Sequence, residues 1–484
     1  MTEAGARPAY ARREVGVVVA VQATLLLAMS PFYGPHRDEL YFVSAGQRLD
    51  WGYPDQPSLT PLLARISTEI APHSLVVLRL WSVLAVVGTV LLAVQFSRLL
   101  GGARKAQVLT AVCVASGAVV MTVGHRLSTA TFDDLAWTAV LLLVTQALVD
   151  DRPRLWLVAG VVAGVGLNNK HAVAMLLVAI LVALVLDGHS RHALRTPWPY
   201  LAGCCAALLW VPNLVWQWRH DWPVLDLSAD IADEYGGIGG RLAMLGEAFS
   251  MYSPFIGVLW VIGTVQLLRR DEWRSARLPA YVLLVVTATF LVTGGKGYYL
   301  AGAIVPLVAA GSTWLAGRLT TVRWAAAGLA VSAMVAWPAL VPVLPERTFV
   351  GSFYSGLNDD QVETIGWDEY AATVREVVAE TSPRPVVFTG NYGEAGAFEW
   401  YGVGTTVFSG HNGWRFWDLP GDDGRPVVVV GFHPGDDFDG CEQVATLLTT
   451  VDVDNEERGA PVWVCDGPVG GWESAWDGLV HYDA

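Results

Sequence analysis

The sequence is short of charge, of lysine and of cysteine. Only 16% of its 484 residues are charged, whereas 53% are hydrophobic, and this balance excludes an ordinary soluble domain. Apolar runs of the length that spans a bilayer recur along the chain. We count eleven of them, at residues 15–34, 74–97, 106–124, 134–149, 155–168, 172–187, 200–216, 253–268, 279–293, 299–316 and 324–344. The sequence therefore predicts a polytopic α-helical membrane protein with about 11 transmembrane helices.

Lysine occurs only at Lys105, Lys170 and Lys296, so arginine carries most of the topology signal. Basic residues crowd the N-terminal segment and the loop after every second apolar run, as they do in cytoplasmic loops. The pattern predicts a plasma-membrane protein with a cytoplasmic N-terminus and an extracytoplasmic C-terminus. Lys170 and Lys296 then lie on the outer face, against the general tendency.

Basic residues are also scarce in the last part of the chain. Residues 345–484 contain 25 acidic and six basic residues, which argues against nucleic acid or anionic lipid headgroups as partners of this segment. Strand-like runs (RPVVFTG, RPVVVVGF, APVWVC) alternate there with helix-like ones (WDEYAATVREVVAE, CEQVATLLTTV). We therefore expect a transmembrane domain at 1–344 and a soluble extracytoplasmic α/β domain at 345–484.

The five cysteines show no metal-type spacing. Cys113, Cys204 and Cys205 fall in apolar runs, where cysteine is a small packing residue. Cys441 and Cys465 fall in the segment expected outside the cell, where oxidising conditions permit a disulfide. We expect that bridge, the alternative being two unpaired buried thiols.

Ionisable residues gather at the ends of the runs that are predicted to face outward. Such groups are costly at membrane depth and by default mark a functional site. Cations there suit the phosphate of a lipid, and a neighbouring carboxylate suits deprotonation of a hydroxyl. The set comprises Asp38, Glu39, Arg126, Asp133, Lys170, His220, Lys296, Tyr298 and Tyr299.

Each member of this set also has a structural interpretation. Asp38 and Glu39 can simply mark the water interface, Asp133 can favour a helix N-terminus, and Lys170 and Lys296 can snorkel from helix ends. The convergence of all of them on one face favours a group transfer from a lipid-linked phosphate to an acceptor. The first outer loop adds a part-apolar helix after Asp38 and a second short one at about 58–68, both expected to lie in the interface plane.

The motifs of the outer loops resemble a known superfamily. RDELYF followed by LDWGYPDQPSLTPLLARIS resembles the first outer loop of GT-C fold glycosyltransferases related to the protein mannosyltransferases and the lipid A aminoarabinose transferases. The similarity continues through TFDDLAWTAVLLL, GVGLNNKHAVAMLL, PNLVWQWRHDWPVLDL and GGKGYYLAGAIVPLVAAG. NYGEAGAFEWYG and SGHNGW resemble an outer domain of a bacterial branch.

The resemblance implies an inverting transfer of a sugar from a polyprenyl-phosphate carrier to a hydroxyl on the outer face. It assigns the catalytic base to Asp38, with Glu39 as its acidic neighbour and Asp133 as a second acid. It places the donor phosphate near Lys170, Lys296, Tyr298 and Tyr299, and we add Arg126 to this group. The last segment is no β-trefoil, so the acceptor stays open among glycan, glycolipid and protein. No dedicated ligand set is present, and an essential divalent metal is not favoured.

The last segment offers a second group of polar residues, which we interpret either as carbohydrate contacts for the acceptor or as loop structure. These are Asn391, Tyr392, Glu394, His411 and Asn412, with His220 from an earlier loop. The competing function is a transporter or flippase for a lipid-linked sugar or small solute, because many spans with buried charge also describe those. Transport would be favoured by internal repeats, and the sequence shows none.

Overall fold

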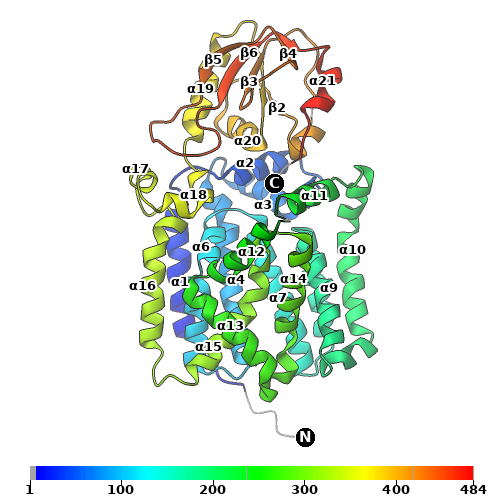
Figure 1. Ribbon diagram of the computed structural model, residues 1–484, viewed down its shortest axis with the longest axis vertical. Coiled ribbons are helices and arrows are strands. Elements are labelled where there is room, and N and C mark those ends of the chain that lie inside the picture. Colours follow the sequence, from blue (N-terminus) through cyan, green and yellow to red (C-terminus); the bar gives the residue numbers. More distant parts are fainter. Residues whose placement is uncertain (1–6, 236, 418, 483–484) are drawn as a thin grey trace. The chain divides into compact units, whose positions relative to one another are not determined.

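The computed structural model describes residues 7–235, 237–417 and 419–482 (Figure 1). The chain divides into two compact units. The first, here the helical unit, comprises Met1–Ala28, Arg79–Arg219 and Ser228–Trp337. The second, here the α/β unit, comprises Met29–Leu78, His220–Leu227 and Pro338–Ala484. The proposed division at residue 344/345 stays a prediction.

The helical unit consists mainly of apolar helices, most of whose axes are roughly parallel or antiparallel to one another (Figure 1). Helices wholly or mainly within it are α1 (Arg12–Met29), α4 (Leu75–Leu99), α5 (Arg104–Ala115), α6 (Ala118–His125), α7 (Thr129–Val149), α8 (Leu155–Leu167), α9 (Ala172–Leu186), α10 (Trp198–Arg219), α11 (Pro223–Tyr235), α12 (Ile238–Ser250), α13 (Pro254–Arg269), α14 (Leu278–Thr293), α15 (Ala301–Ala316) and α16 (Arg323–Leu340). Short 3₁₀ helices η1 (Ser190–Arg195), η2 (Asp271–Ala276) and η3 (Gly297–Leu300) connect some of them.

Helix α15 is the centre of this unit, since it packs against α5, α7 and α13. Its contact with α13 depends on two glycines. A Cβ atom on Gly263 would lie 1.9 Å from the carbonyl oxygen of Leu307, and one on Gly311 would lie 2.0 Å from that of Leu259. The two backbones therefore touch, as small residues allow between membrane helices.

All eleven apolar runs of the sequence contain helix, but their lengths differ. Among the described residues, four segments are long and apolar enough to cross a membrane: Leu75–Leu99, Thr129–Val149, Trp198–Arg219 and Gly297–Ala316. Two bent pairs, α5 with α6 at 56° and α12 with α13 at 95°, raise the number to six if each is one broken span. Helices α8, α9 and α14 are apolar but shorter. The count of about 11 spans stays a prediction.

The α/β unit is built on a five-stranded sheet of order β2-β1-β3-β6-β5. Its strands are β1 (Val386–Thr389), β2 (Val407–Ser409), β3 (Val427–Val430), β5 (Glu442–Thr446) and β6 (Pro461–Cys465), while β4 (Phe438–Asp439) pairs with β7 (Gly467–Pro468). Strands β2, β1 and β3 are parallel to one another. Strand β6 pairs antiparallel with β3, and β5 pairs antiparallel with β6 at the edge of the sheet. A core that includes Phe388, Val429 and Trp472 covers one face.

Helices α19 (Trp367–Glu380), α20 (Tyr392–Tyr401) and α21 (Trp472–Leu479) lie beside this sheet, and further helices complete the unit (Figure 1). The further helices are α2 (Arg37–Gln47), α3 (Leu59–Ile70), α17 (Glu346–Val350) and α18 (Asp359–Val362), with 3₁₀ helices η4 (Ser355–Leu357) and η5 (Asn412–Phe416). The two helices expected in the first outer loop are α2 and α3, and α2 packs against both α3 and α20. Their location at a membrane interface stays a prediction.

One secondary-structure prediction is wrong. The run CEQVATLLTTV was expected to be helical, but Glu442–Thr446 forms strand β5. Its backbone pairs with Pro461–Val464 of β6, so pairing with a strong neighbouring strand overrides the local helix propensity of Glu, Gln, Ala and Leu. The structure joins Cys441, at the start of this strand, to Cys465 of β6 by a disulfide.

Candidate functional site

The first turn of α2 separates the two neighbouring acids of the opening motif. His36 is the N-cap residue: its Nδ1 accepts a hydrogen bond from the Asp38 amide at 3.1 Å, and Glu39 Oε2 accepts one from the His36 amide at 2.9 Å. This is a capping box. Glu39 is 0% exposed and caps the start of the helix, whereas the Asp38 side chain is 35% exposed. Only Asp38 presents a carboxylate to an incoming molecule.

The two oxygens of the Asp38 carboxylate have different surroundings. Tyr392 Oη donates to Asp38 Oδ1 at 3.1 Å. Burial, together with the charge of Asp38, raises the pKa of Tyr392 well above its ordinary value, so this hydroxyl stays protonated and donates. His36 Nδ1 lies 3.8 Å from Asp38 Oδ2. Because that nitrogen accepts from the Asp38 amide, the ring proton resides on Nε2.

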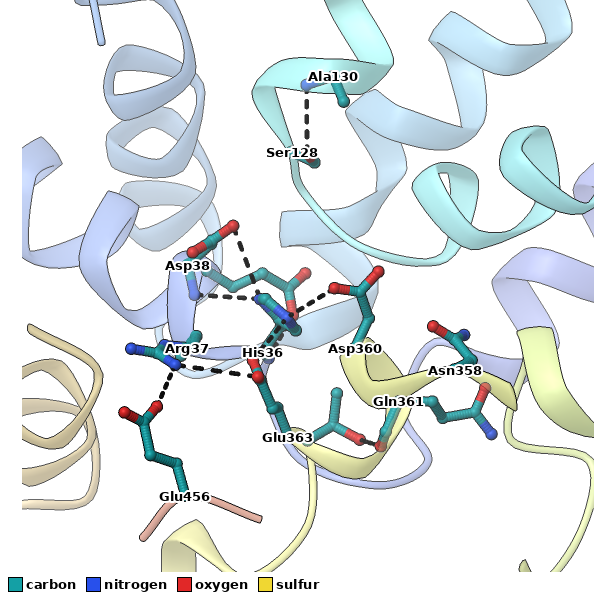
Figure 2. Close-up of polar contacts among 12 residues, drawn as sticks. His36, Arg37, Asp38, Ser128, Ala130, Asn358, Asp360, Gln361, Glu363 and Glu456 are labelled. Carbon is teal, nitrogen blue, oxygen red and sulfur yellow. Dashed lines mark hydrogen bonds and ion pairs between the residues drawn. The ribbon is translucent and has the colours of Figure 1, made fainter. Parts of the chain in front are cut away.

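The far side of His36 meets two further acids, as Figure 2 shows. His36 Nε2 lies 3.3 Å from Glu363 Oε2 and 3.7 Å from Asp360 Oδ1. Arg37 turns away from Asp38: its guanidinium pairs with Glu456 and, at 3.8 Å, with Glu363, and it lies 5.0 Å above the Tyr392 ring. Carboxylates therefore neutralise Arg37, which leaves it poorly suited to bind a phosphate.

Sequence reasoning missed Asp55, another acid of the first outer loop. Tyr41 Oη donates to Asp55 Oδ1 at 2.8 Å and accepts from the Gly413 amide at 3.0 Å. Burial raises the pKa of Asp55 to about 7, and the negative charge of Asp38 adds to the shift. The only local signal was an acid between two prolines in YPDQP, which by itself reads as a turn.

The predicted sugar-contact residues of the last segment mostly serve the fold. Asn391 and Glu394 form a second capping box, with Glu394 N to Asn391 Oδ1 at 2.8 Å and Asn391 N to Glu394 Oε2 at 3.2 Å. Burial raises the pKa of Glu394 to about 8, and the charge of Glu457 contributes. Glu394 is 1% exposed, so its carboxylate does not reach solvent.

The rest of that group lies around a stack of rings. His411 stacks on His481 with ring centroids 4.4 Å apart and lies 4.8 Å from the Tyr392 ring. Asn412 begins η5 with a positive φ of 48°, and its backbone N–H donates to the His481 carbonyl. The His220 ring meets the edge of Phe416 at 5.1 Å. Within this group, Tyr392 contacts Asp38 directly through its hydroxyl.

The helical unit brings Lys170 to the predicted tyrosines. Lys170 Nζ lies 5.0 Å from the Tyr298 ring centroid and 4.7 Å from that of Tyr299. Its charge also acts on the carboxylates of Asp133 and Asp134. Aromatic faces attract an ammonium group through the ring quadrupole, so the two tyrosines and the two acids suit a lysine at this position.

Backbone contacts hold this group in place. Asn169, beside the lysine, donates to the Thr129 carbonyl at 2.7 Å and so ties the α8–α9 turn to the start of α7. Ser128 Oγ caps α7 by accepting from the Ala130 amide at 3.2 Å (Figure 2). Gly302 packs so tightly on α7 that a Cβ atom there would lie 2.5 Å from Trp137 Cβ.

The other predicted cations, Lys296 and Arg126, also belong to the helical unit. Lys296 Nζ lies 5.2 Å from the Tyr235 ring centroid, and Glu247 accepts from the Gly297 amide at 2.7 Å. Arg126 follows α6 and is half-buried. The helical unit thus gathers the predicted donor-phosphate residues and Asp133, and the α/β unit holds Asp38, Glu39 and the predicted acceptor residues.

Comparison of the fold with solved structures identifies its class. ArnT from Cupriavidus metallidurans in the apo state superposes with a TM-score of 0.60 at 13% sequence identity, over 93% of this chain and 97% of that chain. The same protein bound to undecaprenyl phosphate gives 0.62 at 14% identity with the same coverage. The chain has the GT-C glycosyltransferase fold. The fold implied by the sequence resemblance is thus confirmed, and the apolar helices are those of a polytopic membrane protein.

Sequence comparisons agree with the GT-C fold. Residues 55–216 match the family model of dolichyl-phosphate-mannose-protein mannosyltransferase. The lipid A galacturonosyltransferase RgtD from Rhizobium johnstonii is 26% identical over 287 residues, which is 55% of this chain. That match spans 59% of the relative's own length. The family match includes Asp55, Arg126, Asp133 and Lys170 but begins after Asp38.

Proposed function

We propose that this chain is an inverting glycosyltransferase that moves a sugar from a polyprenyl-phosphate carrier to an acceptor hydroxyl on the outer face of the membrane. The observation that carries the proposal is Lys170, which lies against Tyr298 and Tyr299 in a fold shared with ArnT over 93% of the chain. A cation held at membrane depth by aromatic faces fits the phosphate of a lipid carrier. The solved relative was crystallised with undecaprenyl phosphate.

The chemistry needs one base and one neutralised leaving group. Asp38 takes the proton from the acceptor hydroxyl, whose oxygen attacks the anomeric carbon. The bond between that carbon and the phosphate oxygen breaks, and its electron pair leaves on the polyprenyl phosphate. Lys170, with Lys296 and Arg126, stabilises the charge that develops there. A single in-line displacement inverts the anomeric centre and requires no sugar–enzyme intermediate.

Asp38 and Glu39 have different roles within this proposal. Asp38 is half-exposed and is the base, while Glu39 is a positioning residue that fixes the first turn of α2. Tyr392 holds the Asp38 carboxylate in one orientation through its hydroxyl. Hexose and pentose donors, and glycan, glycolipid and protein acceptors, all satisfy this chemistry.

Donor cleavage by the purified protein tests the proposal. The full chain in detergent is incubated with radiolabelled polyprenyl-phosphate sugars and a cell-envelope extract, and released or transferred label is counted. We expect transfer by the wild type and a loss of about 10²–10³ in Lys170→Met, the size of effect seen when one preorganised charge stabiliser is removed.

Lys105→Met is the matched control. Lys105 also belongs to the helical unit, but it lies in the first turn of α5, at an end expected on the cytoplasmic side, and its ammonium donates to the Thr320 carbonyl at 2.6 Å. The Lys105→Met variant should transfer the labelled sugar at the wild-type rate. Equal losses in both variants would overturn the assignment of Lys170. Absence of transfer with every donor, together with lipid or solute flux in vesicles, would favour a transporter.

A further inference from the structure

The α/β unit contains a cavity of about 650 Å³ that the proposed reaction does not use. It lies at the amino ends of the three parallel strands, next to the carboxyl end of α20. Its polar lining includes Gln47, Arg384, Glu399, Thr406 and Arg425. The Asp38 carboxylate, by contrast, is held by Tyr392 at the first residue of α20.

A repeated tetrapeptide builds the cationic side of this cavity. Arg-Pro-Val-Val occurs at 384–387, where it enters β1, and again at 425–428, where it enters β3. The two strands are parallel neighbours in which Val386 pairs with Val427, so Arg384 and Arg425 occupy equivalent positions two residues earlier. Proline restricts the residue before it to an extended conformation. The topology therefore sets the two arginines side by side.

The guanidinium of Arg384 is available to a ligand. Among the residues that the structure describes, no carboxylate or carbonyl oxygen pairs with it, and its Nη2 lies 3.5 Å from the site that a Cβ of Gly404 would occupy. Arg425 Nε donates a hydrogen bond to Asp423 Oδ2 at 2.6 Å, which leaves the Nη atoms of Arg425 to donate to a ligand. That pair is half-exposed and hence weak.

The one acid that lines the cavity is already neutralised. The Glu399 carboxylate accepts hydrogen bonds from Arg48 Nη1 at 3.1 Å and Nη2 at 2.6 Å. It also accepts one from Ser44 Oγ at 2.7 Å. The positive charge is unexpected in this part of the chain, because residues 345–484 contain only six basic residues against 25 acidic ones. Two of those six lie in this one cavity. Distant acids are screened over about 8 Å at physiological salt, so the adjacent arginines decide what binds.

We propose that this cavity binds an acidic saccharide, with the two arginines holding its carboxylate or phosphate group. Paired guanidinium groups match the planar geometry of such anions. The cavity volume is within the range of small-molecule sites and exceeds the needs of a bare anion. Gln47 and Thr406 are exposed and offer an amide and a hydroxyl to sugar hydroxyl groups. Assigning this saccharide to the acceptor rests on the proposed function, whereas the binding does not.

Calorimetric titration of the full-length protein in detergent tests this site. The probes are trigalacturonate and glucose 1-phosphate as acidic saccharides, maltotriose as a neutral one and inorganic phosphate as a bare anion. We expect both acidic saccharides to bind at least about tenfold more tightly than maltotriose and inorganic phosphate, which is about 1.4 kcal/mol. Added salt should weaken their binding.

Variants test whether Arg384 and Arg425 bind the acidic group of the saccharide. Arg384→Gln and Arg425→Gln should each weaken the acidic saccharides, and the double variant should lose at least about tenfold. Arg347→Gln is the matched control, since Arg347 is an exposed arginine of α17 outside the cavity, and its affinity should equal that of the wild type. A thermal unfolding transition at the wild-type temperature verifies that each variant is folded.

Three results would overturn the proposal: unchanged affinity in the double variant, an equal loss in Arg347→Gln, or binding of maltotriose or inorganic phosphate as tight as that of the acidic saccharides. Donor cleavage is measured on the same samples. Saccharide binding without donor cleavage would contradict the proposed transfer reaction alone, and donor cleavage without saccharide binding would contradict the cavity assignment alone.

Discussion

Asp38 and Glu39 are adjacent acids with opposite surroundings, and exchanging each for its amide separates catalysis from stability. In Asp38→Asn the amide oxygen can still accept from Tyr392, but the side chain can no longer take a proton. A positioned base contributes about 10²–10⁴ in rate, so we expect turnover to fall by that factor. The helix keeps its cap, and the lost charge in the first turn costs only about 0.3–1 kcal/mol of stability.

Glu39→Gln gives the reverse pattern. Glutamine also serves in a capping box, so its side-chain oxygen still accepts from the His36 amide. Replacing this buried, charged acceptor by a neutral one costs about 1 kcal/mol of folding free energy. Even if that whole amount appeared in the activation barrier, turnover would fall only about fivefold.

The assay is turnover of a labelled polyprenyl-phosphate sugar at saturating donor, with thermal unfolding recorded on the same preparations. A clear loss of turnover in Asp38→Asn with little change in unfolding temperature supports the assignment. The reasoning is refuted if Asp38→Asn turns over within about tenfold of wild type, or if Glu39→Gln loses as much turnover as Asp38→Asn.

Two further predictions concern the α/β unit. Because burial raises the pKa of Glu394 to about 8, the folded state holds this proton more tightly than the unfolded chain. The contribution of Glu394 to stability is therefore fully present below about pH 4.5 and is lost as the pH rises to about 8. Glu394→Gln keeps the cap and should flatten this part of the profile of unfolding temperature against pH, and an unchanged slope would contradict it. Peptide mapping by mass spectrometry without reductant should find Cys441 linked to Cys465, and two free thiols would contradict the bridge.

The helices of this chain were readable from its sequence because their signals are local. Each apolar run contains helix, and the strand-like runs RPVVFTG, RPVVVVGF and APVWVC contain β1, β3 and β6. The helix predicted after Cys441 was wrong because the pairing of this segment with β6 is a tertiary effect. A run with helical composition becomes a strand when a neighbouring edge offers its backbone partners.

The candidate site was readable in its residue types but not in its contacts. Asn391-Tyr392-Gly393-Glu394 has the spacing of a capping box, so the structural role of Glu394 could have been predicted. The box at the start of α2 uses histidine as its cap, a residue outside the usual set, and this hid the role of Glu39. The Asp55 carboxylate is held by Tyr41, whose hydroxyl in turn accepts from the Gly413 amide, a group remote in sequence. No local sequence pattern predicts such a contact.

The anomeric configuration of the product tests the central claim most directly. The wild-type protein is given a polyprenyl-phosphate sugar of known anomeric configuration, and the transferred sugar is examined by NMR through its anomeric proton coupling. A single displacement by an acceptor that Asp38 deprotonates predicts complete inversion. Retention of configuration would contradict the proposed mechanism, and a donor that stays intact with every acceptor fraction would contradict the proposed function itself.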